Sequence, residues 1–173
     1  MARKRKISLR NKNINEKFVQ EYFEQNINFL GFTDGILLDK EEIQPGSKRL
    51  NMLFQESGTE RCYVVGVKLG NLDENHILKT IEYWNLSKKK YPKFEHCIIF
   101  YVGNITGEAM LLLDSYNKQS QIIVYIIRAF KYYEKPSTCL ENNDKNEKIF
   151  FSCEIVSNNI KPKKKNEPVR KFV

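Results

Sequence analysis

The sequence lacks a long hydrophobic run, and it has few residues that could hold a metal through sulfur or imidazole nitrogen. Its longest apolar stretch, Ile122–Ile127, falls well short of the roughly 18 residues that a membrane-spanning helix needs. There are only four cysteines and two histidines, and no CxxC pair occurs. The basic N-terminus is not followed by an apolar segment of the kind found in secretory signals. These absences argue against a membrane protein and a structural zinc site, and they favour reduced thiols in the cytoplasm.

Ample hydrophobic residues and an uneven distribution of charge are present instead. The 173 residues are 41% hydrophobic, which suits one domain with its own core. The net charge is +8, yet residues 13–160 hold 17 basic and 20 acidic residues. The excess lies in residues 1–12, with six basic residues, and in residues 161–173, with six basic residues and one acid. We therefore predict a basic arm over 1–12, a domain over 13–157 and a basic tail over 158–173, with both ends mobile.

Hydrophobic spacing predicts an alternation of helices and strands. The apolar residues of 14–28 recur at helical intervals, with Asn13 or Asn15 as N-cap, and Gly70 is expected to end a valine-rich strand. A strand–helix–strand crossover over 62–102 implies a parallel pair, so we predict an α/β fold with a mixed central β-sheet flanked by helices. Helices are expected over 14–28, 72–90 and 106–117, the last capped by Thr106 or Asn104. Strands are expected over 36–38, 41–43, 50–55, 62–69, 96–102, 121–132 and 148–156, with a polar loop over 135–147.

Three consecutive segments carry a recognisable pattern: KRLNMLFQ, then RCYVVGVKLG, then ENHILKTIEYW. In this order and on these elements they resemble the motif of the PD-(D/E)XK nuclease superfamily, in its RecB-like form. The resemblance implies a restriction-endonuclease-like fold. It also implies a site in which an Asp and a Glu on neighbouring strands hold Mg²⁺ and a Lys two residues after the Glu assists the attacking water. Side chains two apart on a strand share one face, which explains that spacing.

The chain departs from the pattern at its acids. The Asp position is Asn51, the Glu position is Gly66, and the helix glutamine is Lys79, whereas Lys68 and Tyr83 keep the motif. Glu21 matches an acid of the family's first helix. Because Mg²⁺ prefers carboxylate oxygens, the resemblance implies a degenerate site with no bound metal and no cofactor. Lys68 and Lys79 would make that site positive and attract phosphate.

Three functions remain open from the sequence. The first is a DNA-binding protein without catalysis, whose basic residues contact the phosphate backbone. The second is an active Mg²⁺-dependent endonuclease with relocated carboxylates, and the third is a protein-interaction or inhibitor subunit of a defence or mobile-element system. A homodimer is an analogy with the family, no membrane partner is expected, and nuclear import through Arg3–Lys6 is the alternative to a cytoplasmic location. The candidate nucleic-acid-binding residues are Arg3, Lys4, Arg5, Lys6, Lys68, Lys79, Lys88, Lys89, Lys90, Lys163, Lys164 and Lys165.

Overall fold

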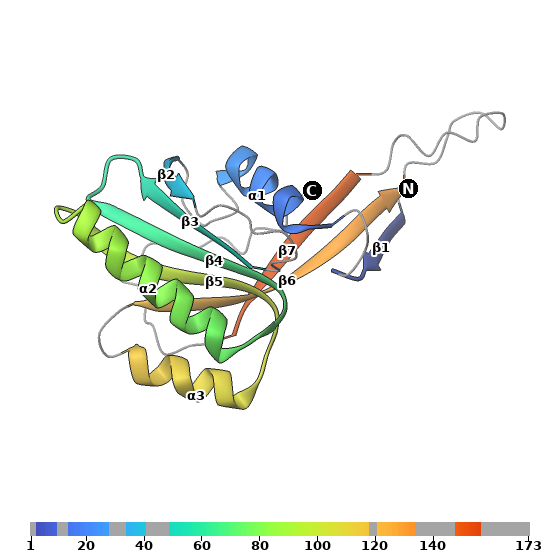
Figure 1. Cartoon of the computed structure of the whole chain (residues 1–173). Coiled ribbons are helices and arrows are strands. Elements are labelled where there is room, and N and C mark those ends of the chain that lie inside the picture. Colours follow the sequence, from blue (N-terminus) through green and yellow to red (C-terminus); the bar gives the residue numbers. More distant parts are fainter. Residues whose placement is uncertain are drawn as a thin grey trace.

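The computed structural model describes residues 3–9, 14–27, 34–40, 49–117, 121–133 and 148–156. Within these ranges the chain forms three helices and a seven-stranded mixed sheet (Figure 1). The helices are α1 (Glu16–Gln25), α2 (Glu74–Lys90) and α3 (Gly107–Tyr116). The strands are β1 (Arg3–Ile7), β2 (Gly35–Lys40), β3 (Arg49–Glu56), β4 (Arg61–Leu72), β5 (Glu95–Ile105), β6 (Ile122–Tyr133) and β7 (Lys148–Ile155).

The sheet follows the order β1-β6-β5-β4-β3-β2, and β7 also pairs with β6. The β4–β5 and β5–β6 pairs are parallel and all the others are antiparallel. Parallel neighbours need a crossover, and α2 and α3 provide the two crossovers. The predicted parallel pair across 62–102 and the predicted α/β class with a mixed, helix-flanked sheet are confirmed.

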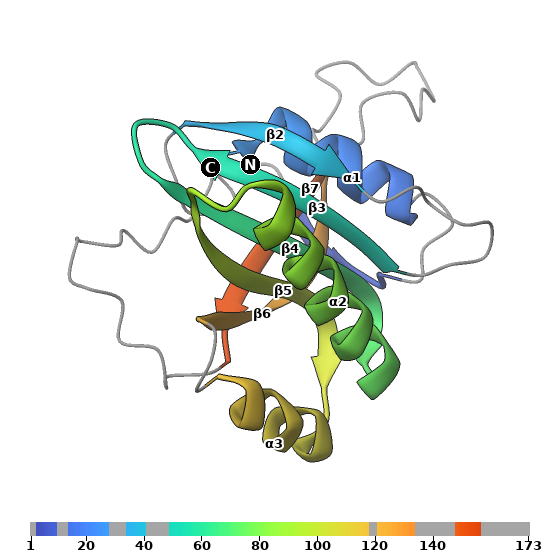
Figure 2. The ribbon, with the colours of Figure 1, turned by 60° about the vertical axis from the view of Figure 1, so that its left-hand side comes forward.

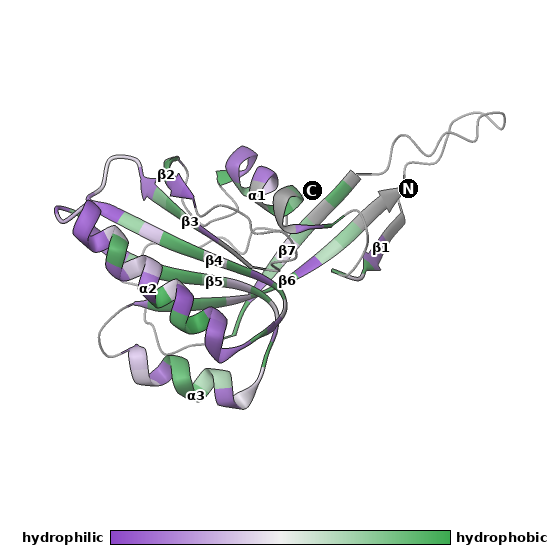
Figure 3. Cartoon of the chain, viewed as in Figure 1, coloured by the Kyte–Doolittle hydropathy of each residue, from purple (hydrophilic) through white to green (hydrophobic). Residues whose placement is uncertain are grey.

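The helices cover the two faces of the sheet separately (Figure 2). On one face, Val19 and Phe23 of α1 pack against alternate residues of the central strands in one buried cluster. On the other face, α2 and α3 pack against the intervening residues in a second cluster, with Ile77, Trp84 and Leu113 as buried members. Strand β5 lies centrally and is apolar over most of its length (Figure 3). Every strand residue near the centre therefore faces either α1 or the α2–α3 layer.

Polar side chains cap the start of each described helix, as the sequence indicates. Asn15, Asp73 and Thr106 each accept a hydrogen bond from the backbone N–H three residues later. Such caps satisfy amide groups that have no partner inside the helix. The cap positions confirm Asn15 for α1 and Thr106 for α3, and they place the start of α2 at Glu74 rather than at the predicted residue 72.

Two local expectations are wrong. Gly70 does not end β4, because the strand resumes pairing with β5 at Asn71 after a register shift and continues to Leu72. The predicted mobile basic arm is also incorrect for Arg3–Ile7, which forms β1 and pairs antiparallel with the end of β6. Ordering a polar segment costs conformational entropy, and the backbone hydrogen bonds between β1 and β6 offset that cost.

Other expectations lie outside the described residues, namely the strand at 41–43, the polar loop at 135–147 and the tail at 158–173. None of the helices in the described ranges has both the length and the apolar content that a membrane crossing demands.

Candidate functional site

The motif positions of β3 and β4 lie side by side on the sheet face that α2 covers. Asn51 is the direct cross-strand partner of Gly66. Lys68 follows two residues later on the same face of β4, as the spacing predicts. The three positions that the sequence singles out on strands are therefore brought together.

Asn51 is a fully buried polar residue held by α2. Its side chain is 0% exposed, and its Oδ1 accepts a hydrogen bond of 2.9 Å from the hydroxyl of Thr80, which is also 0% exposed. A buried amide without hydrogen bonds would cost free energy, so this bond is part of how the core tolerates Asn51. The amide oxygen at the Asp position thus takes part in packing between sheet and helix.

Neighbouring side chains occupy the space that a side chain at position 66 would need. A Cβ atom placed there would lie 3.0 Å from Thr80 Oγ1 and 3.2 Å from two carbons of the Phe100 ring. These approaches are closer than ordinary van der Waals contact. Thr80 and Phe100 therefore fill the volume that a longer residue at the Glu position would need.

Asn51, Gly66, Thr80 and Phe100 form a cluster between the sheet and α2. Lys68 lies at the edge of this cluster and pairs with a carboxylate. Its Nζ lies 3.0 Å from Oδ2 of Asp73, and its side chain is 21% exposed. The other oxygen of Asp73 accepts a hydrogen bond of 2.8 Å from the backbone N–H of His76, at the start of α2. Burial alone would raise the pKa of the Asp73 carboxyl, but the His76 N–H and the Lys68 ammonium together hold it below its ordinary value. The positive charge of Lys68 is thus compensated by the carboxylate of Asp73.

Asp73→Ala is expected to lower the free energy of unfolding at pH 7 by about 1–2 kcal/mol, because α2 loses its N-cap. Asp73→Asn keeps a capping oxygen and should lose less. The carboxyl has its pKa depressed by folding, so its contribution is present above the unfolded pKa of about 3.9 and is lost as the pH falls through the folded value. Urea unfolding at pH 7 and pH 3 measures both effects. An equal loss in Asp73→Ala at the two pH values would contradict the assignment.

The residues at this site do not fit a catalytic Mg²⁺ ion. Mg²⁺ requires hard oxygen ligands in an octahedral arrangement, normally including carboxylates. Asn51 offers a neutral oxygen that already accepts from Thr80, Gly66 offers no side chain, and Asp73 is paired with Lys68. In the described ranges no three His, Cys, Asp or Glu residues are grouped as a metal site would need.

The remaining motif residues do not join this cluster. Lys79 is an exposed residue of α2 and pairs with Glu82 at 3.0 Å, so its charge is compensated by a carboxylate. Tyr83 is half-buried and packs against the apolar cluster beneath α2 and α3. Glu21 belongs to α1, on the opposite face of the sheet, and its side chain is exposed.

The predicted phosphate-binding lysines are also spread out. Lys88 places its ammonium 3.4 Å from the centre of the Trp84 ring, and Lys90 pairs with Asp39 at 2.9 Å. Both lie at the C-terminal end of α2, whereas Lys68 adjoins its N-terminal end, about 25 Å away for 17 residues of helix. Arg5 and Lys6 are exposed on β1. Lys163, Lys164 and Lys165 lie outside the described residues.

Sequence reasoning missed two residues that shape the cluster, Thr80 and Phe100. The helix periodicity contained the information for Thr80, which lies three residues after Ile77 and four before Trp84, on the buried side of α2. The motif comparison aligned the family's glutamine with Lys79, which precedes Thr80 on α2 and faces solvent. Phe100 could not be selected in advance, because every residue from His96 to Val102 is buried.

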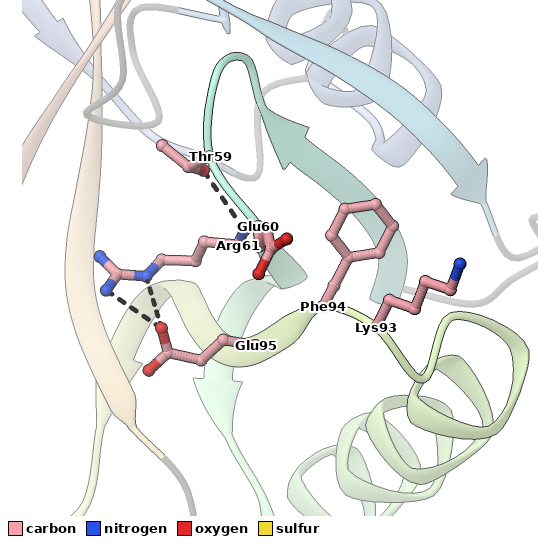
Figure 4. A pocket seen from close by; sticks show the side chains of 6 residues that line it. All are labelled: Thr59, Glu60, Arg61, Lys93, Phe94 and Glu95. Atoms are coloured by element: carbon pink, nitrogen blue, oxygen red, sulfur yellow. Dashed lines mark hydrogen bonds and ion pairs between the residues drawn. The ribbon is translucent and has the colours of Figure 1, made fainter.

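A separate pocket of about 430 Å³ lies at the opposite ends of β4 and β5 (Figure 4). Arg61 and Glu95 form an ion pair of 3.1 Å on one side of it, and Phe94 and Lys93 form the other. Thr59 and Glu60 complete the lining. The two acids and two basic residues balance, so this pocket has no net charge that would select an anion or a cation.

No family model and no curated protein matches the chain. Among solved structures, EndoMS in its apo form is similar at a TM-score of 0.49 and 16% identity, over 65% of this chain and 47% of that one. An EndoMS complex with double-stranded DNA is similar at 0.47 and 15%, over 62% and 43%. The chain thus spans less than half the length of these EndoMS chains. Its fold and site define a mixed α/β protein with an acid-poor polar cluster between β3, β4 and α2.

Proposed function

We propose that the chain is a DNA-binding protein on a PD-(D/E)XK nuclease-like scaffold that has lost metal-dependent catalysis. One observation carries the proposal. Asn51 and Gly66 occupy the two acid positions of the motif, and both are built into the packing of α2 through Thr80 and Phe100. A site that still cleaved DNA through Mg²⁺ would need open space and negative ligands at those positions.

The scaffold assignment is supported by the order and register of the motif elements. Strands β3 and β4 are antiparallel neighbours, α2 follows directly, and β5 returns parallel to β4. Asn51 faces Gly66, and Lys68 stands two residues further on. This is the arrangement that the resemblance leads one to expect for the family's Asp, Glu and Lys.

DNA binding is supported by the charge of the chain and the exposure of its basic residues. The net charge is +8. Arg5, Lys6 and Lys89 are exposed, so their charges are available to phosphate oxygens without burial. Each phosphate that they neutralise would release counterions and strengthen binding at low salt.

Fluorescence anisotropy with labelled duplex, branched and single-stranded DNA tests the proposal. We expect binding in EDTA and in Mg²⁺ with equal affinity, because no metal bridges protein and phosphate. Raising NaCl from 50 to 200 mM should weaken duplex binding about 40-fold if three phosphates are neutralised. Incubation of the same DNA with Mg²⁺ or Mn²⁺ should yield no cleavage.

Two results would overturn this proposal. The first is cleavage that EDTA abolishes and Lys68→Ala reduces, which would favour an endonuclease with relocated acids. The second is no binding to any of the DNA probes at 50 mM NaCl. Among the described residues, Asp73 is the carboxylate that contacts Lys68. The cleavage assay therefore also includes the Asp73→Asn variant.

A role as a protein-interaction subunit is the second candidate. Large apolar side chains are exposed on the α2–α3 layer, with Leu111 at 72% and Leu86 at 57%. Exposed apolar residues of this size are a feature of protein interfaces. Capture of one defined partner that is lost in Leu111→Asp, together with absent DNA affinity, would favour this candidate.

A further inference from the structure

The strands β1, β6 and β7 form an antiparallel extension of the sheet. Residues 122–126 of β6 pair with β5, whereas residues 129–133 pair with β1 along the same edge. Strand β7 pairs along the other edge of β6, from Tyr125 to Tyr132. Figure 1 shows this part projecting to the right, beyond the layer formed by α2 and α3.

The two faces of the extension differ in what covers them. Ile127 and Ala129 of β6 and Phe151 of β7 are buried on the face that α1 covers. The alternate β6 residues Ile122 and Val124 are buried beneath α2 and α3. Beyond Ile126, which is partly buried there, the same alternation places Arg128 and Phe130 on this second face.

Cross-strand partners place further residues on the same face. Lys6 of β1 is opposite Phe130, and Ser152 of β7 is opposite Arg128. We call this surface the β1–β6–β7 face and define it by Lys6, Arg128, Phe130 and Ser152. The aromatic ring of Phe130 therefore lies on the same face as the basic side chains of Lys6 and Arg128.

The described side chains of this face are accessible. Lys6 is exposed, and Phe130 and Ser152 are half-buried. The side chain of Arg128 is 43% exposed, and its contact with Glu154 is 3.6 Å long, with the glutamate 71% exposed. A solvent-exposed pair of this kind is weak, so a phosphate group can compete with Glu154 for the guanidinium group.

We propose that the β1–β6–β7 face binds single-stranded nucleic acid, a role that rests on the proposed DNA-binding function and names its surface. Bases stack on the ring of Phe130, and the phosphates contact Lys6 and Arg128. Base–aromatic stacking tolerates any sequence because every base has a flat π-face. The surface therefore recognises an unpaired strand rather than a particular sequence.

The dimensions of a sheet suit this ligand. Residues on one face of a strand recur about every 6.8 Å, and neighbouring strands lie about 4.8 Å apart. An extended single strand presents its bases and phosphates at a similar repeat, so one ring and its flanking cations can serve one nucleotide. Duplex DNA keeps its bases stacked inside the helix, where Phe130 could not reach them without disrupting pairing. The face should therefore prefer single strands.

Two substitutions in the full chain separate the stacking from the charge contribution. Phe130→Leu keeps an apolar side chain and removes the ring, and we expect it to weaken binding of labelled (dT)20 about tenfold. The dependence of (dT)20 binding on salt should be the same in Phe130→Leu as in the unmodified protein. Lys6→Gln should weaken binding at 50 mM NaCl and reduce the slope of log K against log salt by about 0.7, the value for one phosphate of a single strand. Lys93→Gln removes an exposed charge just before the start of β5 and is the matched control.

The outcomes distinguish this inference from the broader proposal. Loss of (dT)20 affinity in Phe130→Leu and Lys6→Gln, but not in Lys93→Gln, supports it, provided that circular dichroism gives the same melting temperature. If Phe130→Leu fails to fold, the exposed Lys6→Gln variant still decides. DNA binding that neither variant changes, or duplex binding as tight as (dT)20 binding, overturns the inference and leaves the proposed function standing. Absent binding to every DNA probe overturns both.

Discussion

Gly66→Glu, which introduces the acid that the nuclease resemblance implies at this position, is expected to destabilise the protein by about 3–5 kcal/mol rather than to create a metal site. The new Cβ would approach Thr80 Oγ1 to 3.0 Å and the Phe100 ring to 3.2 Å. The carboxylate beyond it would be buried between β4 and α2, where Asn51 and Thr80 are 0% exposed, at a high desolvation cost. Urea unfolding at pH 7 measures the change.

Gly70 provides a matched control on the same strand. A Cβ at Gly70 would have no atom within 4 Å, so Gly70→Glu should stay within about 0.5 kcal/mol of the unmodified protein. The smaller pair Gly66→Ala and Gly70→Ala should differ in the same direction. Thr80→Ala should recover part of the loss in Gly66→Ala, because it removes the closest contact. Equal stability of Gly66→Glu and Gly70→Glu would contradict the account of a filled pocket.

Asn51→Asp, which introduces the other acid implied by the resemblance, is expected to give a protein whose stability falls as the pH rises. Asn51 is 0% exposed, and burial disfavours the ionised form of a carboxyl group. Below about pH 4 the new residue is neutral in both states and can still accept from Thr80. Above that value the unfolded chain ionises more readily than the folded one, so stability declines until the folded carboxyl also ionises. We expect a loss of about 3 kcal/mol at pH 8.

Thermal and urea unfolding from pH 4 to pH 8 measure this dependence. Thr80→Val is the isosteric control, since it removes the hydroxyl that donates to Asn51 without adding an ionisable group. It should cost about 1–2 kcal/mol at every pH, the usual penalty for a buried polar atom that loses a hydrogen bond. A loss in Asn51→Asp that does not vary with pH would mean that position 51 is reached by water.

Together these variants test the proposed loss of metal-dependent catalysis. If both acids are rejected by the packing around them, then reversal of single residues cannot recover a nuclease. The double variant Asn51→Asp with Gly66→Glu would then need compensating changes at Thr80 and Phe100, which lie on α2 and β5. The proposed loss of metal ligands would then be fixed by the packing between the sheet and α2.

The chain's local patterns were sufficient to predict most of its elements. Apolar spacing placed α1, α2 and α3 and the strands β3 to β7, and the crossover through α2 implied the parallel β4–β5 pair. These features depend on periodicity and caps, which are properties of neighbouring residues. The expectation for Arg3–Ile7 was wrong, because the partner of β1 lies more than 120 residues away in β6 and no local pattern records that pairing.

For the candidate site, the sequence by itself determined that the two acid positions hold Asn51 and Gly66 and that Lys68 shares their face, since a strand alternates with a period of two. Only the tertiary structure decided what surrounds them. Thr80 bonds Asn51, Phe100 fills the space beside Gly66 and Asp73 compensates Lys68. The physical reason is that charge and volume at a site depend on residues from several elements, which become neighbours only when helix and sheet pack together.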